Sequence, residues 1–154
     1  MGYIVLFVVL LIADQGSKYW ARTVLYQQSS IQVIPHVLRF SYVENRGAAF
    51  GMLQGQKFFF VIMTFLLIGL FFVYLKKVHA NKWMTLTATV IIAGAIGNLI
   101  DRMLLGYVVD FIDFHIIWRY VFNVADIYVV GGTLLTALQV LLPEEKAKDT
   151  SLSE

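Results

Sequence analysis

The stretch that organises this chain runs from Asn98 to Asp126 and reads NLIDRMLLGYVVDFIDFHIIWRYVFNVAD. It places four aspartates between two long apolar segments that are typical of membrane spans, namely Asp101, Asp110, Asp113 and Asp126. A charged side chain at the centre of a bilayer costs about 2.5 to 3.5 kcal/mol on insertion scales, so acids at membrane depth are candidate functional residues. These aspartates therefore mark the part of the chain where a site is expected.

Composition places the chain among membrane proteins. Of its 154 residues, 59% are hydrophobic, and the mean hydropathy is +0.74. Ordinary soluble domains contain about 45 to 50% apolar residues. The net charge of +2 comes from dispersed basic residues, which gives no reason to expect nucleic acid as a partner. The sequence contains no cysteine, which excludes thiol nucleophiles, disulfides and thiolate metal sites.

Four segments are predicted to cross the membrane. An α-helix needs about 20 mostly apolar residues to span a bilayer. The predicted spans cover residues 3–23, 58–75, 83–100 and 121–142, and a charged tail follows from 143 to 154. Residues 1–154 are therefore predicted to form one membrane-embedded domain.

The segment between the first two spans has a different character. From Tyr26 to Gln56, glycine, serine and Pro35 alternate with β-branched and aromatic residues, which is a pattern of short strands and turns. We predict a small extramembrane β element there. Taken alone, Asn45 in this segment, two residues before Gly47, is interpreted as a turn residue rather than a ligand contact.

Loop charges predict an orientation, although they conflict. Lys76, Lys77 and Lys82 gather around the short loop between the second and third spans. The positive-inside bias places this loop in the cytoplasm, together with both termini and the tail. The opposite side also carries basic residues, namely Lys18, Arg22, Arg39, Arg46, Lys57, Arg102 and Arg119. We expect aspartates to hold several of them, which would weaken their effect on topology.

Polar residues at the ends of three spans are spaced to share helix faces. Asp14 and Lys18 lie four residues apart at the end of the first span, where they either anchor that span as an ion pair or take part in a site. Asn98 and Asp101 end the third span with a spacing of three. Asn123 and Asp126 begin the fourth span with the same spacing. Because both helix ends lie on one membrane side, the two Asn/Asp faces are expected to converge.

The surroundings of the aspartates suggest different protonation states. Asp110 lies in the apolar run GYVVDF, which favours the neutral acid, whereas Arg102 directly follows Asp101 and favours its ionised form. If Asp110 and Asp126 meet at ~4 Å, their repulsion at an effective dielectric of about 20 is about 4 kcal/mol, or roughly three pKa units. The pair would then share one proton. Aspartic proteases use this arrangement: one carboxylate takes a proton from water while the other donates to the developing oxyanion.

Spacing alone leaves three readings of these acids open. They could pair with Arg102 and Arg119 and hold the helix ends together, form a proton or ion pathway, or catalyse hydrolysis. Asp113 is predicted to lie on a loop beside His115 as a solvated or locally paired charge. No sequence motif of serine hydrolases, zinc peptidases or phosphate-binding loops is present, and the histidines lack ligand spacing, so neither metal nor cofactor is predicted. The tryptophans Trp20, Trp83 and Trp118 are interpreted as membrane-interface residues.

Five short motifs, taken in order, resemble those of the bacterial lipoprotein signal peptidases, the signal peptidase II family. They are DQGSK at Asp14–Lys18, NRGAAF at Asn45–Phe50, GAIGNLIDR at Gly94–Arg102, GYVVDF at Gly106–Phe111 and FNVAD at Phe122–Asp126. The likeness extends from Asp14 to the end of the fourth span. One departure is Ile127, which stands where a small hydroxyl residue is usual in the family.

The resemblance implies a fold and a set of site residues. The fold would be an all-α polytopic membrane protein with four transmembrane helices and a small extracytoplasmic β cradle between helices 1 and 2. The catalytic dyad would be Asp110 and Asp126, and Asp101 would be structural. The residues that would bind substrate or support the site are Asp14, Lys18, Asn45, Gly47, Asn98, Asp101, Arg102, Asn123 and Ala125.

The resemblance also implies an activity and a location. The enzyme would be an aspartic endopeptidase that removes the signal peptide from diacylglyceryl-modified prolipoproteins by cutting just before the lipidated cysteine. It would be a monomer in the bacterial inner membrane, among phospholipid, with its active site toward the extracytoplasmic face. The alternatives are a small proton- or ion-translocating membrane protein that uses the same aspartates, and an export scaffold with a degenerate site.

Overall fold

The computed structural model describes residues 1–28, 30–47, 56–79, 81–114 and 120–142. Some of the predictions fall outside these residues. They concern the AAF part of the NRGAAF motif at positions 48–50, His115, Trp118, Arg119 and the tail from 143 to 154.

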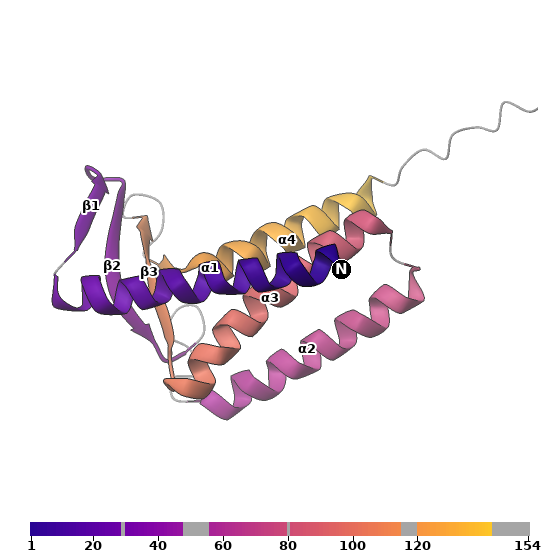
Figure 1. The fold of residues 1–154 in the computed structure, drawn as a ribbon, viewed down its shortest axis with the longest axis horizontal. Coiled ribbons are helices and arrows are strands. Elements are labelled where there is room, and N and C mark those ends of the chain that lie inside the picture. Colours follow the sequence, from indigo (N-terminus) through magenta and orange to yellow (C-terminus); the bar gives the residue numbers. More distant parts are fainter. Residues whose placement is uncertain (29, 48–55, 80, 115–119, 143–154) are drawn as a thin grey trace, which may run out of the picture.

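Four long helices form the body of the described part of the chain (Figure 1). They are α1 (Gly2–Val24), α2 (Lys57–Lys77), α3 (Lys82–Leu104) and α4 (Val124–Leu141), and each is long and apolar enough to cross a membrane. The first three contain the predicted spans. The fourth helix begins later than predicted, because Val121 and Phe122 form a strand and Asn123 caps the helix.

Small residues bring α1, α3 and α4 into close contact. A Cβ atom added to Gly97 on α3 would collide with the Asp14 carboxylate of α1, and one added to Gly94 would collide with the Ala125 carbonyl of α4. At Gly132 on α4 it would lie 2.6 Å from the Ile91 side chain. By contrast, α2 makes its main helix contacts with α3, has no buried residue, and lies apart from α4 in Figure 1. The site therefore rests on a tight three-helix unit.

Gly97→Ala is expected to lower the free energy of unfolding by about 1 to 3 kcal/mol, because overpacking forces neighbouring groups apart. Gly16→Ala is the matched control: it lies on α1, and its added Cβ would meet nothing within 4 Å. That change should be neutral or stabilising, since alanine favours a helix over glycine by about 1 kcal/mol. Thermal unfolding in detergent measures both. Equal stability of the two variants would contradict this close packing.

A four-stranded antiparallel sheet lies at one end of the helices, in the order β1 (Ile31–Ile34), β2 (Leu38–Asn45), β3 (Val108–Phe114) and β4 (Val121–Phe122) (Figure 1). In its described residues, the predicted β element between the first two spans supplies β1 and β2. The other two strands come from the connection between α3 and α4, which the sequence did not reveal as β structure. The fold class is thus confirmed for its four helices and extended for its sheet.

Successive side chains of β3 alternate between two faces, and the two faces have different surroundings. Val109 and Phe111 are buried with Ala21 and Leu25 at the end of α1. Asp110 points to the opposite face, because successive side chains alternate across a strand. Trp20, interpreted from the sequence as an interface residue, is partly buried here and packs edge-on against Phe40 and Phe111 at ring distances of 5.5 and 6.1 Å. This apolar cluster fixes β3, and so Asp110, against α1.

Candidate active site

Asp110 lies in the middle of β3 with a side chain held by two amides. Asn45 Nδ2 donates to its Oδ2 at 2.8 Å, and Asn123 Nδ2 donates to its Oδ1 at 2.6 Å. The residue is only 2% exposed. Burial, followed by repulsion from Asp126, raises the pKa of Asp110 from 3.8 to about 7. Asp110 can therefore hold a proton near neutral pH.

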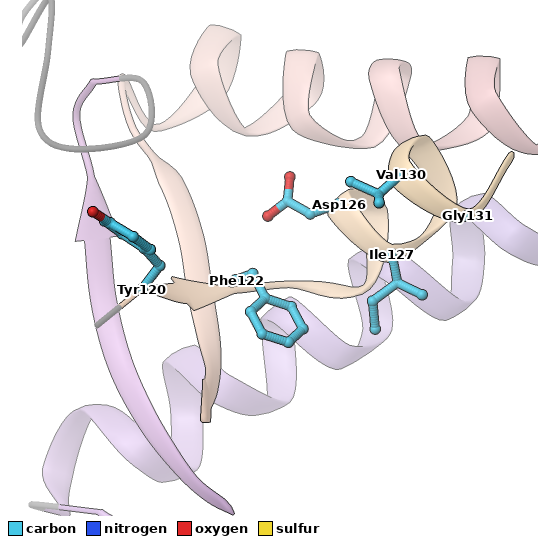
Figure 2. A pocket seen from close by; sticks show the side chains of 6 residues that line it. All are labelled: Tyr120, Phe122, Asp126, Ile127, Val130 and Gly131. Atoms are coloured by element: carbon cyan, nitrogen blue, oxygen red, sulfur yellow. The ribbon is translucent and has the colours of Figure 1, made fainter. Parts of the chain in front are cut away.

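Asp126 lies on the first turn of α4 and is half-buried (Figure 2). Asn98 Nδ2 donates to its Oδ1 at 2.8 Å, and the backbone N–H of Asn123 donates to its Oδ2 at 3.2 Å. The Asn123 side chain accepts in return from the Asp126 backbone N–H at 3.0 Å, which completes a capping box. The positive end of the helix dipole favours a carboxylate at this position.

Asn98 links this pair of acids to the buried part of α1. Its Oδ1 accepts from Lys18 Nζ at 2.9 Å and from Asn123 Nδ2 at 3.2 Å. Because two donors face the oxygen, the amide nitrogen must face Asp126. Lys18 and Asn123 together thus set which end of the Asn98 amide meets the carboxylate.

Lys18 lies between two buried carboxylates. Its ammonium is 3.0 Å from Asp14 Oδ2 and 3.3 Å from Asp101 Oδ2, and all three residues are at most 3% exposed. The i,i+4 ion pair with Asp14 was expected from the sequence, whereas the third partner was not. Asp14 also accepts from the Ala125 backbone N–H at 2.9 Å, and Asp101 accepts from the Val109 backbone N–H at 3.0 Å. These acids bind α1, α3, α4 and β3 together.

Arg102 contributes charge rather than an ion pair. Its guanidinium lies 4.8 Å from the centre of the Phe60 ring, and its Nη1 donates to the Asn98 carbonyl at 3.4 Å. It attracts Asp126, Asp110 and, more weakly, Asp101 at longer range. Within the described ranges no carboxylate forms an ion pair with Arg102, so a clamp of the acids by Arg102 is not found there.

Asn45 combines a turn role with a contact to the site. Its Oδ1 accepts from the Gly47 backbone N–H at 3.1 Å while its Nδ2 reaches Asp110. The reading of Asn45 as a turn residue alone was therefore incomplete. Antiparallel pairing of β2 with β3 brings Asn45 and Asp110 together across 65 residues of sequence, a contact that sequence spacing does not reveal.

Asp113 and Gln15 also differ from what the sequence suggested. Asp113 lies on β3 rather than on a loop, is 5% exposed, and pairs with Arg39 of β2 at 2.5 Å, so it is paired but not solvated. Gln15 was not singled out, yet its Nε2 donates to Asp14, to Asp101 and to the Gly97 carbonyl at 3.0 to 3.2 Å. The only sequence signal for Gln15 was its place beside Asp14 in the DQGSK motif.

Comparison with known proteins identifies the family. The family described as Signal peptidase (SPase) II matches residues 6–142. The chain belongs to the signal peptidase II family. A lipoprotein signal peptidase from Clostridioides difficile is 46% identical over 150 residues, which cover 96% of this chain and all of that protein. Another, from Caldanaerobacter subterraneus subsp. tengcongensis, is 49% identical over 133 residues, which cover 86% of this chain and 89% of that one.

A solved structure agrees with this membership. A bacterial membrane enzyme shares the fold with a TM-score of 0.86 and 34% sequence identity, covering 99% of this chain and 94% of its own. As a signal peptidase II, the protein is a peptidase and a multi-pass membrane protein with an aspartic type of mechanism. This membership favours hydrolysis over ion translocation. The expectation that neither metal nor cofactor takes part stays a prediction.

Proposed function

We propose that Asp110 and Asp126 form the catalytic dyad of this peptidase, and that its substrate is a prolipoprotein with diacylglycerol on the cysteine that follows the scissile bond. The observation that best supports the dyad is a pair of hydrogen bonds from Asn123. This residue donates to Asp110 through its side chain and to Asp126 through its backbone. One residue thereby holds both carboxylates in a single hydrogen-bonded network. The relatives named lipoprotein signal peptidase support the substrate.

The environments of the two acids suggest their roles. Asp110 is buried and has a raised pKa, whereas Asp126 is half-buried on the first turn of α4, near the positive end of the helix dipole. In the first step Asp126 takes a proton from water, the water oxygen bonds to the scissile carbonyl carbon, and Asp110 gives its proton to the carbonyl oxygen. In the second step Asp126 passes its proton to the leaving nitrogen, the C–N bond breaks, and Asp110 recovers a proton from a hydroxyl of the intermediate.

This division of roles predicts a pH dependence. The raised pKa of Asp110, about 7, means that its proton is bound below that pH and lost above it. We expect kcat to fall as the pH rises through about 7, because the acid that protonates the carbonyl oxygen disappears. Stability should also decrease with rising pH between about 4 and 7, since the folded state holds this proton more tightly than the unfolded chain. A pH profile of kcat checks the first statement; a rate that stays constant from pH 6 to pH 9 would contradict it.

The paired cations support the orientation predicted for the chain. Of the basic residues on the side of the sheet, Lys18, Arg39 and Arg46 all form ion pairs with acids. Because these cations are paired with acids, they count less in the positive-inside comparison than the lysines around the connection between α2 and α3. We therefore place the sheet and the dyad on the extracytoplasmic side of the bacterial inner membrane, and we expect a monomer surrounded by phospholipid.

A matched pair of substrates tests the function. Detergent-solubilised protein is incubated with a diacylglyceryl precursor peptide and with the same peptide lacking the lipid. We expect cleavage of the lipidated peptide only, visible as a gel shift. Ion flux in liposomes without cleavage would instead support the translocation alternative, and binding of the lipidated precursor without turnover would support the scaffold alternative.

A further inference from the structure

A groove of about 470 Å³ opens beside Asp126. We call it the α4 groove. Its described lining consists of Tyr120, Phe122, Asp126, Ile127, Val130 and Gly131 (Figure 2). Apart from the Asp126 carboxylate and the Tyr120 hydroxyl, these residues present apolar surface, so the α4 groove suits an apolar ligand group.

The α4 groove opens on a helix face that other elements leave uncovered. Ile127 is 48% and Val130 is 58% exposed, and in a transmembrane helix such apolar side chains face lipid. In Figure 2, Ile127 and Asp126 project in different directions from the first turn of α4. The α4 groove therefore connects a carboxylate of the dyad with the lipid phase.

The α4 groove reaches only one acid of the dyad. Asp126 lines it, whereas Asp110 is 2% exposed and does not. A peptide undergoing hydrolysis must pass both carboxylates, so the α4 groove branches away from the path of the peptide backbone. Its occupant is then a group that branches from the substrate next to the scissile bond.

The size of the α4 groove indicates whether its occupant is a lipid chain or an amino-acid side chain. One water-sized group needs about 10 to 15 Å³ of space measured in this way, so the 470 Å³ of the α4 groove holds many such groups. A leucine side chain has four carbons, whereas a long acyl chain has many more. We propose that the α4 groove receives one acyl chain of the diacylglyceryl group carried by the cysteine after the scissile bond. This proposal rests on the proposed function.

Gly131 offers a way to fill the α4 groove without disturbing the fold. A Cβ atom added there would meet nothing within 4 Å, so a larger side chain can enter open space. Gly131→Leu is therefore expected to fold normally while it occupies part of the α4 groove. Gly69→Leu on α2 is the matched control, because its added Cβ also meets nothing and it does not line the α4 groove.

The experiment compares two precursor peptides that differ only in acyl length, one with dipalmitoyl and one with dipropionyl glyceryl. We expect Gly131→Leu to lower kcat/KM for the long-chain peptide about tenfold and to leave the short-chain peptide nearly unaffected. Gly69→Leu should change neither. Adding Ile127→Ala to Gly131→Leu should restore part of the long-chain activity, because it returns volume to the α4 groove.

Two results would overturn the proposal. An equal loss on both peptides would assign the α4 groove to a part of the substrate other than the acyl chain. No loss on either peptide would mean that the α4 groove stays empty during turnover. Thermal unfolding in parallel shows whether Gly131→Leu is folded. Failure of the wild-type protein to cleave either lipidated peptide would instead refute the proposed function, so the two failures are distinguishable.

Discussion

Asp110→Asn is expected to reduce kcat by about 10³-fold or more while the protein stays folded and inserted. Asparagine keeps the shape of the side chain but cannot release a proton to the carbonyl oxygen, and general acid–base groups contribute about 10² to 10⁴-fold. Asp126→Asn should have an effect of similar size, because the base that activates water is lost. The double variant should be little worse than either single one, since the two acids act as a unit. Turnover of a diacylglyceryl precursor peptide measures all three.

Asp113→Asn provides the matched control for this prediction. It makes the same chemical change three residues away on β3, at a buried carboxylate that pairs with Arg39 instead of joining the dyad. We expect it to stay active, with at most a loss of stability. Retained cleavage by Asp110→Asn or Asp126→Asn would refute the dyad, and an inactive but folded Asp113→Asn would show that the sheet contributes more than support.

The sequence predicted the features that depend on local pattern. Continuous apolar runs predicted the helices, and i,i+4 spacing predicted the ion pair between Asp14 and Lys18, which is found at 3.0 Å. The boundary of α4 was misplaced because Val121 and Phe122 are as apolar as a helix core. The capping box of Asn123 and Asp126, readable in principle as an Asn followed three residues later by an acid, decides that boundary.

Contacts made by strand pairing could not be predicted in the same way. Asn45 meets Asp110 and Arg39 meets Asp113 only because β2 pairs with β3. The register of two strands separated by two transmembrane helices leaves no periodic signal in the sequence. β3 itself was hidden because two aspartates interrupt its apolar pattern. The choice of Asp110 as one acid of the dyad therefore depended on the family resemblance rather than on spacing.

Lys18→Met is expected to destabilise the protein by about 3 to 5 kcal/mol, the usual cost of removing one partner of a buried ion pair. The change would leave Asp14 and Asp101 buried without their cation, and both are at most 3% exposed. Thermal or denaturant unfolding in detergent measures the loss. Arg46→Met is the control: it also removes a cation from an ion pair, but its side chain is 60% exposed, so we expect less than about 1 kcal/mol.

A compensated variant separates the charge effect from a loss of packing. Lys18→Met combined with Asp14→Asn and Asp101→Asn removes the two uncompensated carboxylates, so much of the stability should return. Activity should not return with it, because Asn98 would still lack the ammonium that faces its Oδ1 and turns its Nδ2 toward Asp126. Stability that stays low in the triple variant would show that Lys18 acts through packing. Recovery of full activity together with stability would show that the Asn98 amide is oriented without Lys18, by Asn123 alone.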